Sequence, residues 1–171
     1  MLYVGFMLLG AAAYMLLLQS FSQLKKKEEE YSAIVALLGH MRGKLASGGG
    51  RLCDILHGFA SRALEDNGLL AVLKNDGIRN SPGGNVARNC FFRDSIGKIE
   101  FRIDKRDAEK LTAYFESYGK SYIEEEKRKL DEITDYFCGK EKSFSEKTEK
   151  DIKARQAVFA FAFVGLFIAL L

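Results

Sequence analysis

The charged side chains of this chain are confined to its middle. No Asp, Glu, Lys or Arg occurs in residues 1–24 or in residues 156–171, so all of them lie between Lys25 and Arg155. This layout constrains the fold, because a segment this rich in charge needs water around it and the two uncharged ends do not. We therefore predict two transmembrane helices, residues 1–24 and 156–171, that form a hairpin and carry a domain of residues 25–155.

The first apolar run is long enough to cross a bilayer. Leu2 to Phe21 gives about 20 largely apolar residues, which at roughly 1.5 Å per residue match the thickness of the hydrocarbon core. The alternative is a cleavable signal peptide, which begins with basic residues and ends at a small-residue cleavage site. No basic residue precedes this run, and Lys25, Lys26 and Lys27 follow it. A retained membrane anchor is therefore the favoured interpretation.

The second apolar run is shorter. Ala157 to Leu171 comprises 15 residues without a polar face, whereas a buried helix of a globular protein normally has one. The stems of Lys153 and Arg155 can extend the apolar length at the membrane surface, and a thin bilayer accommodates a short span. We therefore favour a second membrane leg over a core helix.

The basic residues beside the two runs predict the orientation. Lys25–Lys27 follow the first run, and Lys150, Lys153 and Arg155 precede the second. Basic residues at the ends of membrane helices favour the cytoplasmic side. The middle domain would then be cytoplasmic and the protein double-pass in a bacterial cell membrane. The three cysteines are widely spaced and show no disulfide pattern, which fits reduced thiols in a cytosol.

The middle domain is predicted to be mostly α, a helical bundle. Its single proline suits that class, and apolar residues at helical spacing predict five helices. They cover residues 28–46, 51–66, 69–74, 105–118 and 121–155. The glycines after Ala46 make a short linker, so we expect the first two helices to pack antiparallel.

Finer expectations concern five segments whose pattern is weaker. Glu28–Glu30 would lie in the first turn of a helix, at the positive end of its dipole, and Glu124–Lys129 would be solvated. Residues 139–149 are weakly apolar and would bend or fray. Residues 80–85 form a turn-rich loop, and residues 90–104 alternate partly like a strand. Because a lone strand is unstable, we predict a helix and an extended connector there, with a strand as the open alternative.

No catalytic constellation is present in the sequence. Gly119-Lys120-Ser121 ends like a phosphate-binding loop but lacks the upstream glycine and strand that such a loop needs. Cys53 and His57 share a helix face, yet two ligands are too few for a structural zinc. The small net charge of +3, of mixed sign, argues against nucleic acid. We therefore predict a protein that is not an enzyme and that uses no cofactor and no metal.

The layout and one segment resemble the stage III sporulation protein AB family. Residues Ile103 to Ser121 are similar to its pattern Leu-x3-Asp-x3-Leu-x2-Phe-Gly-x2-Leu-Gly-x-Ser, with Asp107 and Leu111 in register. Gly5, Leu38, Met41, Leu45 and Leu52 also fall on family positions. Among its departures from the family, Phe115 replaces a glycine, Tyr122 and Glu126 stand where Asp and Gln are expected, and Arg51 stands where proline is common.

The resemblance implies a function without catalysis. That family belongs to a channel complex between mother cell and forespore, and its cytoplasmic region is similar to the F-type platform domains of type II secretion and type IV pilus machines. The chain would then be an adaptor in the mother-cell membrane, with a secretion-type ATPase, other membrane proteins of the complex and lipid as partners. We expect part of the partner surface at Glu124, Glu125, Lys127 and Arg128. The alternative is a membrane-tethered helical scaffold or regulator unrelated to sporulation.

Overall fold

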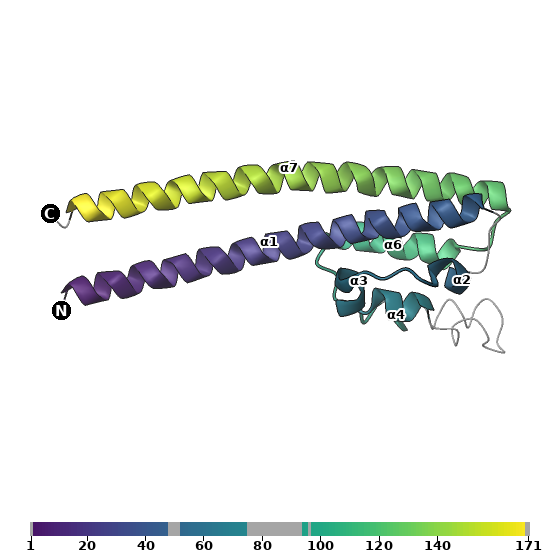
Figure 1. Ribbon diagram of the computed structural model, residues 1–171, viewed down its shortest axis with the longest axis horizontal. Helices are drawn as coiled ribbons and strands as arrows, with labels where there is room; N and C mark the ends of the chain where they lie inside the picture. Colours follow the sequence, from purple (N-terminus) through teal and green to yellow (C-terminus); the bar gives the residue numbers. More distant parts are fainter. Residues whose placement is uncertain (1, 48–51, 75–93, 96, 170–171) are drawn as a thin grey trace. The chain divides into compact units, whose positions relative to one another are not determined.

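The computed structural model describes residues 2–47, 52–74, 94–95 and 97–169, and this part of the chain is helical and contains no strand. The helices are α1 (Leu2–Ala46), α2 (Leu52–Leu56), α3 (Arg62–Asp66), α4 (Leu69–Lys74), α6 (Lys105–Ser117) and α7 (Ile123–Ala169) (Figure 1). The chain divides into two compact units. Unit 1 comprises residues 1–28 and 142–171, and unit 2 comprises residues 29–141. The mostly α, bundle-like prediction is confirmed.

Unit 1 is an antiparallel pair of helical segments from α1 and α7. Arg155 donates a hydrogen bond to the Ser20 hydroxyl at 2.5 Å, and the Lys27 ammonium lies 5.0 Å from the centre of the Phe144 ring. Earlier residues of α1 thus face later residues of α7, as a helical hairpin requires. Within the part of the chain that the structure describes, no helix combines the length and the apolar character needed to cross a membrane. The two membrane legs stay a prediction.

Helix α1 joins into one helix the two that the sequence predicts, at residues 1–24 and 28–46. The prediction of a helix start near Glu28 is wrong, because α1 is continuous from Leu2. Residues 23–30 are rich in Gln, Leu, Lys and Glu, which favour helix, and contain neither Gly nor Pro to end it. Glu28–Glu30 therefore lie inside a helix rather than at the positive end of its dipole.

The predicted helix over residues 51–66 is two helices, α2 and α3. Gly58 lies between them with φ of 84°, a left-handed conformation that ends a helix and that glycine adopts without strain. Turn hydrogen bonds around this break join the His57 amide to Asp54 and the Phe59 amide to Leu56. The sequence contains this glycine signal, but the apolar periodicity around it favours one continuous helix. The predicted bounds of α4, by contrast, are confirmed.

Gly58 and Gly39 give opposite expected results for one substitution. Gly58→Ala should lower the free energy of unfolding by about 1–2 kcal/mol, because an L-residue is strained at this φ. Gly39 lies inside α1, where a methyl group in place of its hydrogen would have nothing within 4 Å, so Gly39→Ala should raise it by about 0.5–1 kcal/mol. Denaturant titration of both variants checks the signs. If both substitutions changed the free energy of unfolding by the same amount, the left-handed turn at Gly58 would be wrong.

The core of unit 2 is formed where α1, α6 and α7 meet. The predicted apolar stripes are confirmed at most positions, and their buried members are Tyr31, Ile34, Leu38, Met41 and Leu45 in α1, Leu111, Tyr114 and Phe115 in α6, and Leu130, Ile133 and Phe137 in α7. The Tyr31 ring of α1 packs against the Phe137 ring of α7, with 6.4 Å between the ring centres. Leu37 is buried as well, whereas Ile123 at the start of α7 is 46% exposed.

Helices α2 to α4 add a second layer to this core. Figure 1 shows them beside α1, and they contribute buried leucines together with the buried Ile55. The His40 ring nitrogen bonds the Ile55 carbonyl at 2.8 Å and so ties α1 to α2. On another side of α1, the Arg42 guanidinium meets the Asp131 carboxylate at 2.8 Å and ties α1 to α7. Pairing residue 42 with 131 and residue 31 with 137 makes α1 and α7 antiparallel in this unit too.

Two further expectations concern residues 139–149 and the connector before α6. Helix α7 is continuous through residues 139–149, so the expected fraying there is wrong. Residues 99–104 form an extended connector with no strand, as predicted. The predicted loop at 80–85 and the start of the predicted 90–104 helix lie outside the described residues.

Candidate functional site

The predicted partner surface lies in the first turns of α7. Glu124, Glu125 and Arg128 are exposed and Lys127 is partly exposed. Their charges are paired along the helix: Lys127 with Glu124 at 3.1 Å, Arg128 with Glu132 at 2.6 Å, and Glu125 with Lys129 at 3.0 Å. Exposed pairs of this kind contribute only about 0.3–0.5 kcal/mol to stability, so a partner can exchange them at little cost.

Glu126 does not belong to that surface. It is 5% exposed, and one carboxylate oxygen accepts a hydrogen bond from the Ser121 amide at 3.1 Å. Its other oxygen and the Tyr114 hydroxyl are buried, and neither has a hydrogen-bond partner among the described residues. The expectation that residues 124–129 form a solvated run is therefore wrong at Glu126, because this residue occupies the apolar stripe of α7 four positions before Leu130.

A buried carboxylate holds the three main helices of unit 2 together. Asp107 of α6 is fully buried and accepts hydrogen bonds from the Tyr31 and Tyr136 hydroxyls, each at 2.6 Å. The Lys140 ammonium adds an ion pair at 3.2 Å. Burial by itself would raise the pKa of the Asp107 carboxyl, but the bonds from Tyr136, Tyr31 and Lys140 outweigh burial and lower it.

A second buried carboxylate positions the connector. Glu30 of α1 is fully buried and accepts hydrogen bonds from the Asn67 amide group at 3.0 Å and from the Arg102 backbone amide at 2.9 Å. Burial raises the pKa of Glu30, and the bonds from Arg102 and Asn67 oppose that rise. The side chain thus joins α1 to the turn before α4 and to the connector before α6.

The lowered pKa of Asp107 predicts a pH dependence. A carboxyl group whose pKa is lower in the folded chain stabilises the fold above its unfolded value of 3.8 and loses that contribution as the pH falls further. Stability should therefore decline below about pH 4, and Asp107→Asn should flatten this decline. Denaturant titrations from pH 5 to pH 2 measure it, with exposed Asp135→Asn as the control. An unchanged acid slope in Asp107→Asn would contradict the assignment.

Two sequence fragments suggested a metal site and a phosphate-binding loop, and neither such site is formed by the described residues. His57 is exposed, and no group of three or more His, Cys, Asp or Glu side chains that could hold a metal occurs in the described part of the chain. Gly119 adopts φ of 77° in the turn between α6 and α7, so Gly119-Lys120-Ser121 follows a helix rather than the strand of a phosphate-binding loop.

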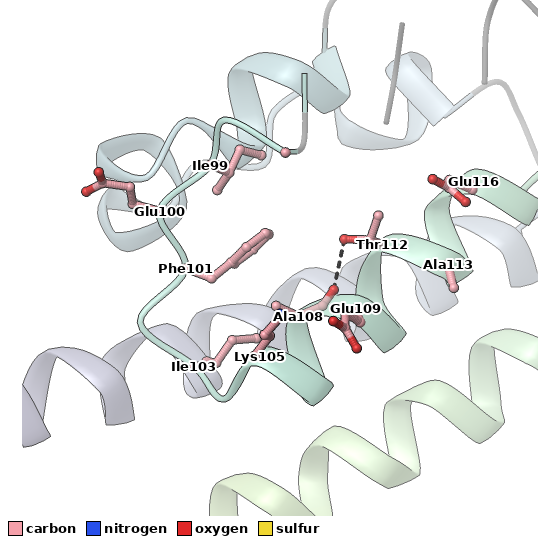
Figure 2. Close-up of a pocket in the computed structure, with 11 residues that line it drawn as sticks. Ile99, Glu100, Phe101, Ile103, Lys105, Ala108, Glu109, Thr112, Ala113 and Glu116 are labelled. Carbon is pink, nitrogen blue, oxygen red and sulfur yellow. Dashed lines mark hydrogen bonds between the residues drawn. The ribbon is translucent and has the colours of Figure 1, made fainter. Parts of the chain in front are cut away.

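A groove runs between the connector and α6 (Figure 2). It encloses about 670 Å³ and is lined on one side by Ile99, Glu100, Phe101 and Ile103, and on the other by side chains of α6. The Phe101 ring points towards α6 in Figure 2. Sequence reasoning missed this groove, because its two walls come from a connector of ambiguous pattern and from the polar face of an amphipathic helix.

The chain matches no protein-family model, and neither the curated proteins nor the solved structures contain a significant match to it.

Proposed function

We propose that the chain is a non-enzymatic membrane component of a sporulation channel of the secretion type, in which it serves as an adaptor for the ATPase. The observation that carries the proposal is the confinement of all charge to the middle of the chain, joined with the motif that begins at Ile103. Its three regularly spaced residues, Ile103, Asp107 and Leu111, are all buried. A motif that builds a helical core supports a likeness to the helical platform domains.

The arrangement of unit 1 supports the membrane part of the proposal. Contacts of Ser20 with Arg155 and of Lys27 with Phe144 pair α1 and α7 in antiparallel order next to the two apolar ends. A hairpin of that kind places both ends on one face of a membrane and residues 25–155 on the other. Reporter fusions at both termini and at Asn85, which lies outside the described residues, test this topology. A reporter at Asn85 that works only outside the membrane would overturn it.

The ATPase part is tested by association of full-length protein, reconstituted with lipid, with a hexameric secretion-type ATPase of the same host. Binding should be measurable at low salt and should weaken as salt rises, because exposed charges steer and select partners and are screened by ions. The adaptor itself should release no phosphate from ATP. No association at low salt, with both proteins folded and membrane partners supplied, would leave only the scaffold alternative.

Charge reversal locates the contact. Two double variants should each weaken ATPase binding about tenfold, or roughly 1.4 kcal/mol. One is Glu124→Lys with Glu125→Lys, and the other is Lys127→Glu with Arg128→Glu. The matched control reverses the exposed Arg62–Asp66 pair of α3, whose atoms lie 3.9 Å apart. Stability should change by less than about 0.5 kcal/mol in all three variants. Equal binding by the α7 variants and the control would move the partner surface elsewhere.

A further inference from the structure

The groove between the connector and α6 is built on a helix face that the bundle does not use. Helix α6 turns Asp107, Leu111, Tyr114 and Phe115 into the core of unit 2. Residues spaced at three, four and seven positions form the opposite face, and all of them line the groove: Lys105, Ala108, Glu109, Thr112, Ala113 and Glu116. The connector runs along this second face as the other wall (Figure 2).

The centre of the groove is apolar and can admit a peptide. Ala108 and Ala113 carry only methyl groups, so another backbone can approach α6 closely here. The Thr112 hydroxyl donates its proton to the Ala108 carbonyl at 2.8 Å, within α6, and so does not donate it into the groove (Figure 2). Ile99 and Phe101 from the connector are only partly buried. Together these side chains offer an apolar surface next to solvent, and the groove volume lies within the range of about 300–1,000 Å³ that is usual for ligand pockets.

The charge of the groove is predominantly negative. Among the described residues that line it, Glu100, Glu109 and Glu116 are acidic and Lys105 is the single basic one. Glu109 and Glu116 are two turns apart on the same face of α6, so their carboxylates flank the small side chains between them. No salt bridge within the described residues uses any of the three glutamates. An occupant with positive charge on either side of an apolar contact would complement this pattern.

We propose that this groove binds a peptide segment of a partner protein in which apolar side chains are flanked by Lys or Arg. The apolar side chains lie against Phe101, Ala108 and Ala113, and the basic side chains pair with Glu109 and Glu116. The carboxylates supply selectivity, and the apolar floor supplies most of the affinity. This proposal does not depend on the ATPase, because the groove lies on α6 and the connector, whereas the proposed ATPase surface lies on α7.

The test is a selection from a random twelve-residue peptide library displayed on phage, against full-length protein in detergent. Peptides that carry Lys or Arg beside apolar residues should be enriched. Fluorescence polarisation of the enriched peptides should show binding that weakens as salt rises.

Three variants decide whether the groove is the site. Ala113→Arg fills the apolar floor, and Glu109→Lys with Glu116→Lys reverses the rim; each should weaken binding about tenfold or more. These side chains are exposed or partly exposed, so the fold should survive, and exposed Glu65→Lys on α3 is the matched control. The proposal is overturned if no peptide is enriched, if the enriched peptides are acidic or purely apolar, or if Ala113→Arg binds them as well as the unaltered chain.

Discussion

Asp107→Asn is expected to lower the free energy of unfolding of unit 2 by about 3 kcal/mol, since hydrogen bonds to a charged acceptor contribute roughly 1.5–3 kcal/mol each. Two tyrosine hydroxyls donate to this fully buried carboxylate. An amide keeps the shape but loses the charge and one acceptor oxygen, so one buried hydroxyl is left without a good partner. Near-UV circular dichroism of the full-length chain during denaturation follows the loss, because the tyrosines report on packing.

Tyrosine variants separate the two bonds of this network. Tyr31→Phe removes the buried donor and should cost more than Tyr136→Phe, whose half-buried hydroxyl water can replace. Tyr114→Phe is the control, because the Tyr114 hydroxyl is buried without a hydrogen-bond partner among the described residues, and its removal should be neutral or stabilising. If Asp107→Asn lay within about 0.5 kcal/mol of the unaltered chain, the carboxylate would not be holding the helices together.

The three carboxylates that are buried in the described part of the chain share a spacing that can be read from the sequence. Glu30, Asp107 and Glu126 each lie four residues before a buried apolar residue of the stripe in their helix, namely Ile34, Leu111 and Leu130. Helical spacing alone therefore predicts that they face the core. Glu30 and Glu126 end runs of three glutamates, and such runs are typical of solvated faces. The hydrogen-bond partners of Glu30 lie 37 and 72 positions away in the chain, which periodicity cannot supply, whereas Glu126 accepts its hydrogen bond from Ser121, five positions away.

The helices were predictable where periodicity and breakers agree. The bounds of α4 and the start of α6 follow directly from the sequence, and so does the stripe of α1. The break at Gly58 was missed because apolar residues continue at helical spacing on both sides of it. The continuity of α1 through residues 25–27 was missed because a change from apolar to charged composition resembles the end of a helix. A helix ends only where its backbone is interrupted, and Gln-Leu-Lys-Lys-Lys-Glu does not interrupt it.

Of the two candidate surfaces, the charged one on α7 could be predicted from the sequence and the groove could not. The exposure of Glu124 and Arg128 could be predicted, because both lie off the stripe of α7. The pairing of each charge along the helix also follows from three- and four-residue spacing. The groove could not be predicted, because its shape depends on where Glu30 holds the connector through the Arg102 amide. That contact joins residues 72 positions apart, and no local pattern records it.

Leu111→Ala is expected to lower the free energy of unfolding by about 2–5 kcal/mol, the range for emptying a fully buried leucine site. Leu111 is 0% exposed and lies one turn after Asp107, where α6 packs into the bundle. The matched control is Ile123→Ala at the start of α7, where a 46% exposed side chain loses little buried area and should cost well under about 1 kcal/mol. Leu111→Met, which conserves volume, should cost less than about 1.5 kcal/mol. Equal losses in Leu111→Ala and Ile123→Ala would show that α6 does not turn this face towards the core, and the opposite face that lines the groove would then be misplaced as well.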